Sequence, residues 1–216
     1  GQLPTDTPQS IIILQSRLPK ALTAILAGCA LPVAGLLMQT FFRNPVAGPD
    51  ILGVSAGSSL LVALVMLTVV TWFSMDVFSN VGIILAAIVG AMLVLFIILG
   101  VAARVRDSVT LLIFGLMFGM AISAVVGVLQ YYSSQGALKL FIMWTFGSLS
   151  GVTWSQLYIL AVIVIIGLLL AVTQIKALNL LLLGEQYATS LGLNIRKSKI
   201  FIILTTGLLT GAITAF

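Results

Sequence analysis

The chain has 216 residues, of which 61% are hydrophobic and only 7% are charged, and its mean hydropathy is +1.26. A soluble domain of this length cannot bury so much apolar surface, so the composition indicates an integral membrane protein. The apolar runs are about 20 residues long, as a helix needs to cross a bilayer, and they lack the alternation of barrel strands. We therefore predict an all-α, polytopic helical bundle that forms a single transmembrane domain over residues 1–216.

The ten Lys and Arg residues exceed the five acids and give a net charge of +5. They lie almost entirely between the apolar runs, where membrane topology explains them, so no nucleic-acid partner is expected. The single cysteine, Cys29, lies within an apolar run, so no disulfide framework is predicted within the chain. The start of the chain lacks the pattern of a signal peptide.

The apolar runs and the turns between them predict six membrane spans. The first opens at the motif RLPK, residues 17–20, where Pro19 suits a first helical turn, and the apolar patch at 11–15 suits the membrane interface. Asn44-Pro45 predicts the turn that follows, because the residue before a proline is pushed out of helical geometry. The predicted spans cover residues 19–42, 51–73, 81–103, 109–132, 157–175 and 200–216.

The segment 176–199, between the last two predicted spans, is too short and too polar to cross a bilayer. Its pattern predicts two short helices. Gly184 ends the first, Glu185 opens the second with its charge at the positive end of the helix dipole, and Gly192 closes it. From the residues alone, a connector that tucks onto the spans is the simpler interpretation, and a docking surface for a soluble partner is the alternative.

Small residues recur at every fourth position of the fourth predicted span and share one helical face. They are Gly115, Gly119, Ser123 and Gly127. Such a stripe lets helix backbones approach closely, so helix packing is the favoured interpretation. A smooth wall beside a pathway for a bulky solute is the alternative. A second pair, Gly207 and Gly211, is expected to pack against spans outside residues 1–216.

The distribution of positive charge predicts the orientation, because cytoplasmic loops hold the excess of Lys and Arg. Seven of the ten basic residues belong to one set of alternate loops: Arg43, Arg104, Arg106, Lys176, Arg196, Lys197 and Lys199. The other set holds Arg17, Lys20 and Lys139. We therefore expect the segment 176–199 in the cytoplasm and residue 1 outside. This arrangement predicts that the chain is the middle portion of a longer permease.

The sequence offers few residues for chemistry. It has no His, no cysteine pair and no carboxylate within a predicted span, so neither a metal site, a proton relay nor a catalytic residue is predicted. It also lacks the phosphate-binding pattern GxxxxGK[ST], so a separate subunit would have to hydrolyse ATP. A secondary transporter is disfavoured, because such proteins place charged sites near the bilayer midplane. A non-transporting membrane assembly subunit stays open as an alternative.

Three separated stretches resemble the FecCD-type permeases of bacterial ABC importers, which take up iron-siderophore chelates, haem and cobalamin. They are RLPKALTAILAGCALPVAGLLMQTFFRNPVAGPDILGVSAGSSL, WTFGSLSGVTW and LNLLLLGEQYATSLGLNIRK. Members of that family have roughly ten spans of about 20 residues each, so the resemblance implies that this chain holds the second to the seventh. The sequence departs from the family at Lys20, where arginine is frequent.

The resemblance implies a function and partners. The function is that of the permease subunit of an ATP-driven importer, which moves a ferric siderophore or related chelate from periplasm to cytoplasm by alternating access. Cobalamin or haem are the alternative solutes. The implied partners are a second permease chain, cytoplasmic ATPase subunits that bind ATP and Mg²⁺, and a periplasmic or lipid-anchored solute-binding protein. The implied location is the bacterial cytoplasmic (inner) membrane, and the chain itself is expected to bind no cofactor.

The resemblance also implies roles for individual residues. Arg17 and Lys20 would face the binding protein, and the stripe from Gly115 to Gly127 would line the pathway. The cytoplasmic gate would comprise Asn44, Pro45, Val46, Asp107, Ser108 and Val109. The segment that couples to the ATPase would comprise Leu178, Asn179, Leu182, Gly184, Glu185, Ala188, Leu191, Gly192 and Leu193. For the segment 176–199, the resemblance therefore favours a docking surface over a simple connector.

Overall fold

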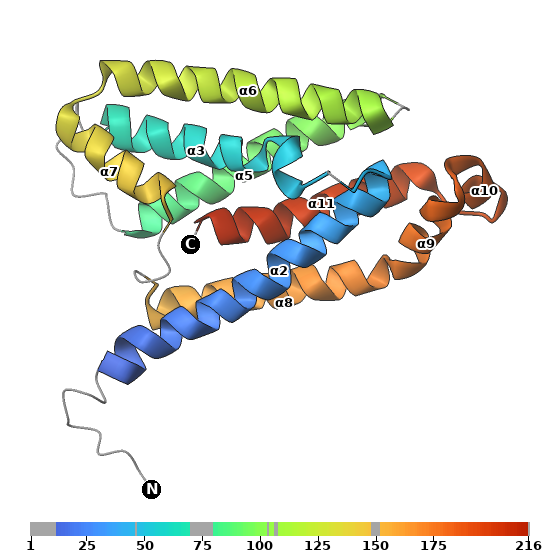
Figure 1. Ribbon diagram of the computed structural model, residues 1–216, viewed down its shortest axis with the longest axis horizontal. Coiled ribbons are helices and arrows are strands. Elements are labelled where there is room, and N and C mark those ends of the chain that lie inside the picture. The colour runs from blue at the N-terminus through green and yellow to red at the C-terminus, as the bar shows by residue number, and fades with distance from the viewer. Residues whose placement is uncertain are drawn as a thin grey trace, which may run out of the picture.

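The computed structural model describes residues 12–45, 47–69, 80–102, 104–105, 108–147 and 152–215. Long helices run side by side along the molecule (Figure 1). They are α2 (Leu18–Phe42), α5 (Asn80–Ala102), α6 (Ser108–Tyr132), α8 (Trp154–Thr173) and α11 (Ile195–Ala215). The shorter elements are η1 (Ile13–Arg17), η2 (Pro49–Leu52), α3 (Val54–Ala63), η3 (Leu64–Val69), α7 (Gln135–Thr145), α9 (Ile175–Leu183) and α10 (Glu185–Ser190). The described residues contain no strand.

Five helices among the described residues are long and apolar enough to cross a membrane. They are Ile13–Phe42, Gly82–Ala102, Val109–Tyr132, Trp154–Thr173 and Ile195–Ala215. This confirms the prediction of an all-α, multi-pass membrane protein. The predicted span at 51–73 is represented by a shorter apolar helix, Val54–Leu67, and the end of that predicted span lies outside the described residues.

The predicted first span, 19–42, agrees within one residue with α2 (Leu18–Phe42), but the helix also extends before it over residues 13–17. This stretch is a π-helical turn, η1, that continues directly into α2. Pro19 explains the wider turn, since a proline has no N–H to donate to the preceding turn. The Leu18 N–H then bonds five residues back to the carbonyl of Ile13 instead of four. Arg17 therefore lies inside a helix rather than at its beginning.

The predicted start of the last span is wrong, because α11 begins at Ile195 rather than at residue 200. Asn194 precedes the helix, and its Oδ1 accepts a hydrogen bond from the backbone N–H of Lys197 at 3.1 Å. This is the bond that an N-cap side chain makes to a helix N-terminus. Lys199 consequently belongs to α11 and not to the connecting segment.

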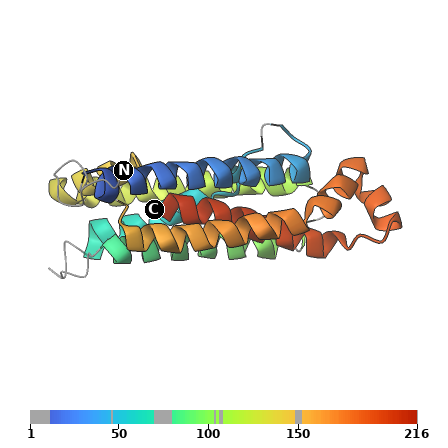
Figure 2. The ribbon, with the colours of Figure 1, turned by 90° about the horizontal axis from the view of Figure 1, so that it is seen from below.

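The central helix of the bundle is α11. In its most apolar 18-residue stretch 61% of residues are buried inside the chain, against 22–39% for the other four candidate spans. It contacts α2, α5, α8 and α3, and Figure 2 shows it between α2 and α8. Ile202 and Ile203 of α11 join Leu37 and Met38 of α2 in the main apolar core. The membrane-facing helices therefore pack around a helix that is largely shielded from lipid.

Glycines set the closest helix approaches. A Cβ at Gly207 would lie 2.6 Å from the Leu95 side chain, and one at Gly211 would lie 3.1 Å from the Ala91 Cβ. Both glycines of α11 therefore pack against α5 within this chain, which corrects the expectation of partners outside it. The crossing of α3 and α5 is tighter still, because a Cβ at Gly90 would collide with the Gly57 carbonyl.

Candidate functional site

Figure 1 shows α9 and α10 at one end of the bundle, and α7 and the start of α2 at the opposite end. We call the end that carries α9 and α10 the α10 end, and the opposite end, with α7 and the start of α2, the α7 end. The α10 end holds Arg43, Arg104, Lys176, Arg196, Lys197 and Lys199. The α7 end holds Arg17, Lys20 and Lys139. Apart from Arg106, which lies outside the described residues, the two sets of basic residues counted in the sequence lie at opposite ends of the molecule.

The segment after α8 folds into the predicted pair of short helices, α9 and α10. Gly184 separates them with a φ of +121°, a conformation that side chains with a Cβ rarely adopt, and Gly192 follows α10 with a φ of +87°. Leu178, Leu181 and Ala188 are buried in the main apolar core together with residues of α2 and α11. One face of the α9–α10 pair is therefore fixed to the bundle by apolar packing.

The α9–α10 pair and the residue that follows it also expose four large apolar side chains, beside exposed polar ones such as Asn179 and Gln186. Leu182 is 58% exposed, Leu183 63%, Tyr187 69% and Leu191 63%. These residues lie at the end of the bundle, among basic turn residues, and not along the lipid-facing sides of the spans. An exposed apolar surface in such a place is typical of a protein–protein contact. We call these four residues the outer face of the pair.

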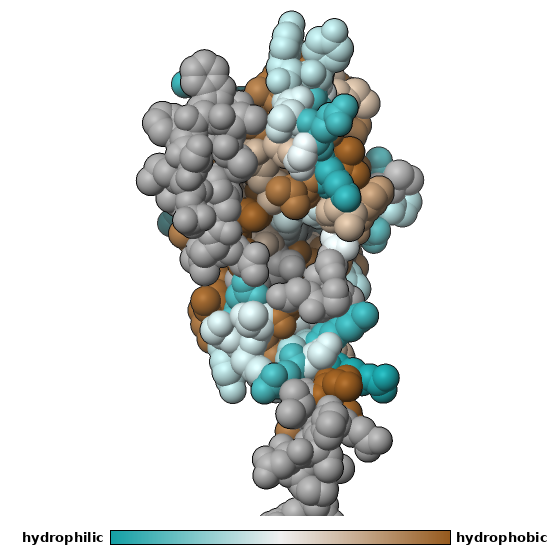
Figure 3. All heavy atoms as spheres, turned by 90° about the vertical axis from the view of Figure 1, so that its left-hand side faces the viewer, coloured by the Kyte–Doolittle hydropathy of each residue, from teal (hydrophilic) through white to brown (hydrophobic). Residues whose placement is uncertain are grey.

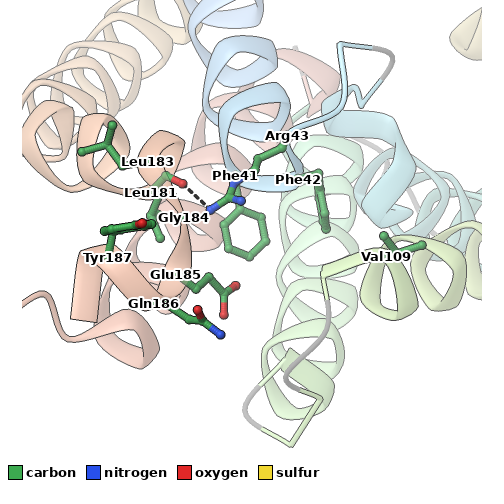
Figure 4. A pocket seen from close by; sticks show the side chains of 10 residues that line it. All are labelled: Phe41, Phe42, Arg43, Val109, Leu181, Leu183, Gly184, Glu185, Gln186 and Tyr187. Atoms are coloured by element: carbon green, nitrogen blue, oxygen red, sulfur yellow. Dashed lines mark hydrogen bonds between the residues drawn. The ribbon is translucent and has the colours of Figure 1, made fainter. Parts of the chain in front are cut away.

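A pocket of about 560 Å³ lies between the α9–α10 pair, the end of α2 and the start of α6 (Figure 4). Its lining comprises Phe41, Phe42, Arg43, Val109, Leu181, Leu183, Gly184, Glu185, Gln186 and Tyr187. The Arg43 guanidinium donates to the Leu181 carbonyl at 2.5 Å, which places a positive charge at the C-terminal end of α9. Arg43 itself ends α2 in the left-handed region, with a φ of 48°. The end of α2 is thereby joined directly to α9.

The predicted gate residues are only partly described by the structure. Val46, Asp107 and the side chain of Ser108 lie outside the described residues. Asn44 and Pro45 form the turn after α2, in which the Asn44 N–H donates to the Gln39 carbonyl at 3.1 Å. Val109 lines the pocket together with Arg43. Val109 is thus the one described gate residue that lines the pocket, while Asn44 and Pro45 follow the lining residue Arg43 in the chain, and gating by these residues stays a prediction.

The residues predicted to couple to an ATPase differ in exposure. Asn179, Leu182, Leu191 and Gly192 are exposed, and Gly184, Glu185 and Leu193 are half-buried. Leu178 and Ala188 are buried against the bundle. The exposed and half-buried residues are therefore accessible at the surface of the chain. The two buried residues, Leu178 and Ala188, instead pack the α9–α10 pair against the bundle.

The stripe of small residues on α6 passes through two environments. A Cβ at Gly115 would lie 2.6 Å from the Ile51 carbonyl oxygen, and one at Gly119 would lie 3.4 Å from the Gly53 Cα. Ser123 is exposed, and a Cβ at Gly127 would meet nothing within 4 Å. The first two small residues therefore pack against η2 and the start of α3. The second two leave an open face on α6, and their role in a pathway stays a prediction.

At the α7 end, Arg17 and Lys20 are both exposed and lie one turn apart on the same helix. Trp154, at the start of α8, donates from its indole Nε1 to the Leu14 carbonyl at 3.1 Å. Figure 3 looks onto this end and shows hydrophilic and hydrophobic side chains interspersed. Such a mixed surface is typical of a membrane–water interface.

Two residues of the α10 end were missed as site residues in the sequence. Arg43 was counted only as a loop charge, although a basic residue directly after a helix is well placed to bind its neighbours' terminal carbonyls. Lys199 was assigned to the connector, but it lies in α11 with only 6% of its surface exposed. The sequence signal for this position was Asn194, a residue type that favours the N-cap of a helix. A helix that begins after Asn194 includes Lys199 and places it on the same face as the apolar Ile202 and Ile203.

Comparisons with known proteins agree with this architecture. The profile of the FecCD transport family matches residues 2–216. The chain is 35% identical over 209 residues to the hemin transport system permease protein HmuU of Yersinia pestis, covering 94% of this chain and 61% of that protein. It is 35% identical over 206 residues to the vitamin B12 import system permease protein BtuC of Serratia proteamaculans, covering 95% of this chain and 60% of that protein.

Among solved structures, the chain is similar to a transporter assigned to the metal-chelate type of ABC transporters, in an inward-facing conformation. The TM-score is 0.86 at 28% identity, and the likeness covers 100% of this chain and 67% of that chain. The chain spans about 60% of the length of the two curated relatives named above. Its several membrane-crossing helices and these relatives indicate a multi-pass protein of the bacterial cytoplasmic (inner) membrane. On the family match over residues 2–216, the chain belongs to the FecCD transport family.

Proposed function

We propose that this chain is part of the transmembrane permease subunit of an ATP-driven importer. The observation that carries the proposal is the outer face of the α9–α10 pair, where Leu182, Leu183, Tyr187 and Leu191 are exposed at the basic end of the bundle. The excess of positive charge favours a cytoplasmic location for that end. A soluble ATPase subunit that binds the outer face supplies the nucleotide chemistry, with ATP and Mg²⁺ bound on the ATPase.

We propose an iron chelate, a ferric siderophore or haem, as the solute, with cobalamin as the alternative. Support comes from relatives that are named for hemin and for vitamin B12 and from a structural neighbour of the metal-chelate type. These solutes are bulky and are recognised largely by shape. The open face of α6 at Ser123 and Gly127 suits such a solute, because small side chains leave room beside the helix.

Two further partners complete the proposed importer. A second permease chain would face the open side of α6, so that the solute passes between two copies by alternating access. A periplasmic or lipid-anchored binding protein would deliver the solute at the α7 end, where Arg17 and Lys20 form a small exposed positive patch. Charge complementarity at such a surface mainly raises the rate and precision of encounter.

Co-purification tests the proposed docking surface. Tyr187→Asp in the full-length permease places a charge in the outer face, and the ATPase subunit is expected to be lost from the purified complex. Tyr131→Asp is the matched control, because both tyrosines are well exposed, Tyr131 to 82% and Tyr187 to 69%. Tyr131 differs in lying near the α7 end. The control is expected to retain the ATPase. An ATPase that stays bound to Tyr187→Asp and is lost from Tyr131→Asp would contradict the proposal.

The alternative of a non-transporting assembly subunit makes a different prediction. Proteoliposomes that contain the full-length permease, its ATPase and its binding protein are expected to accumulate hemin, a ferric siderophore or cyanocobalamin when ATP is supplied. An assembly subunit would bind its partners and accumulate none of the three.

A further inference from the structure

The side chain of Lys199 lies inside the molecule, near the start of α11. The residue is only 6% exposed, although lysine is seldom buried unless its ammonium is paired. Ile203 and Thr206 lie four and seven residues further along the same helical face, and both are buried. A charged group on the buried face of the central helix requires partners from other elements.

Two other elements hold the ammonium group. Its Nζ lies 3.3 Å from Oε1 of Glu185, the first residue of α10. It also lies 5.7 Å from the ring centroid of Phe41 near the end of α2, within the range of a cation–π attraction. The Lys199 side chain is 8% exposed and that of Glu185 is 41% exposed, so the ion pair reaches from the core to the edge of the pocket. Lys199 thus links α11 to both α10 and α2.

Two hydrogen bonds fix α9 to the same two helices. At its C-terminal end, the Leu181 carbonyl accepts from Arg43, which directly follows α2 (Figure 4). At its N-terminal end, the Gln174 side-chain amide donates to Oγ1 of Thr205 in α11 at 2.6 Å. Polar contacts therefore tie the α9–α10 pair to α2 and α11 at both ends of α9 and at the start of α10.

We propose that Lys199 is a positioning residue for transport, which makes α11 and α2 follow any displacement of the α9–α10 pair. The inference rests on the proposed function, in which an ATPase moves that pair. An ion pair with one buried partner resists separation more than an exposed pair does, because less water screens it. Since α11 is the central helix, a movement passed through Lys199 reaches the middle of the bundle.

The test measures solute taken up per ATP hydrolysed in proteoliposomes of the full-length permease with its ATPase and binding protein. The probe is whichever of hemin, ferrichrome and cyanocobalamin the wild-type protein imports fastest. Lys199→Met combined with Glu185→Gln removes both charges and keeps the side-chain volumes, so the fold is expected to hold. Lys199→Met alone leaves the half-exposed Glu185 of the predicted coupling segment unchanged, and we expect the ATPase to co-purify with this single variant at wild-type yield. Uptake per ATP by the double variant is expected to fall at least about fivefold, the lower end of typical coupling between sites.

Two further variants separate positioning from stability. Lys199→Arg keeps the charge and is expected to keep most of the wild-type uptake per ATP. Glu185→Gln alone breaks the ion pair at its more exposed partner, and it serves as the test if changes at Lys199 prevent folding. We expect Glu185→Gln to lower uptake per ATP, but by less than the double variant, because the glutamine side-chain oxygen can still accept a hydrogen bond from the Lys199 ammonium group.

A wild-type ratio of uptake to ATP hydrolysis in the double variant would overturn the proposal. Loss of the ATPase from Lys199→Met alone would also overturn it, because the ion pair would then hold the docking surface together and not transmit its movement. Failure of the proposed function has a different signature. In that case the wild-type permease itself would bind no ATPase or import none of the three probes.

Discussion

The indole N–H of Trp154 donates a hydrogen bond to the carbonyl of Leu14, with the two atoms 3.1 Å apart. The sequence explains why this carbonyl is available. In a regular α-helix the Leu14 carbonyl would accept from the Leu18 N–H, but here the Leu18 N–H donates to the Ile13 carbonyl. The next residue, Pro19, has no N–H to donate. The tryptophan at the start of α8 therefore satisfies a backbone acceptor that a proline leaves unpaired in the neighbouring helix.

Trp154→Phe is expected to destabilise the full-length protein by about 1 kcal/mol, since the ring remains but the donor is lost. Thermal unfolding in detergent measures the effect. Pro19→Ala supplies an N–H to this stretch of helix, so Trp154→Phe should cost less in that background. Equal effects of Trp154→Phe with and without Pro19 would show that the indole bond is not compensating for the proline.

Gly90→Ala is expected to destabilise the protein by about 1–3 kcal/mol, because its Cβ would collide with the Gly57 carbonyl where α3 crosses α5. Gly100→Ala in the same helix is the matched control, since a Cβ there meets nothing within 4 Å. The melting temperature should fall for Gly90→Ala and stay level or rise for Gly100→Ala, where alanine also favours the helix. The reverse order would mean that α3 and α5 do not cross at these glycines.

The stripe on α6 should respond to substitution in two ways. Gly115→Ala is expected to lower the melting temperature, because its Cβ would lie 2.6 Å from the Ile51 carbonyl oxygen. Gly127→Leu is expected to leave the melting temperature unchanged and to reduce uptake, because it fills an open face. Full uptake by a well-assembled Gly127→Leu permease would indicate that this part of α6 faces lipid.

Reversing the charge of Arg17 and Lys20 tests their proposed role at the outer surface. The double change to glutamate is expected to slow docking of the solute-loaded binding protein while basal ATPase activity of the purified complex persists. Exposed ion pairs contribute only about 0.2–1 kcal/mol each and are screened by salt, so the effect should be largest at low ionic strength. Docking at the wild-type rate in low salt would identify the two residues as lipid anchors.

Much of the fold followed from the sequence because long apolar runs determine where helices can cross a membrane. The helices at 80–102, 108–132 and 154–173 lie within a few residues of their predicted bounds. The differences arose at residues next to helix ends, Pro19 and Asn194. Pro19 lies in the first turn of α2, as predicted, but the π-helical turn that extends the helix before it was not predicted.

The site was predicted less completely than the fold. The glycine at 184 and the acid that follows it correctly predicted the break between α9 and α10. Pairing between distant segments leaves no local pattern, so the contacts of Arg43 with Leu181 and of Lys199 with Glu185 required the structure. The four-residue spacing on α6 likewise showed that the small residues share a face but not that half of them meet another helix.

Crosslinking at Gln186 tests most directly whether the α9–α10 pair is a cytoplasmic docking surface for an ATPase. Gln186 is exposed and lines the pocket beside the outer face. A full-length permease without other cysteines, which includes Cys29→Ser, carries Gln186→Cys as its single thiol. We predict that this thiol crosslinks to the ATPase subunit in inner-membrane vesicles and stays unlabelled by an impermeant maleimide added to intact spheroplasts. Labelling from the periplasmic side, without a crosslink to the ATPase, would contradict the account.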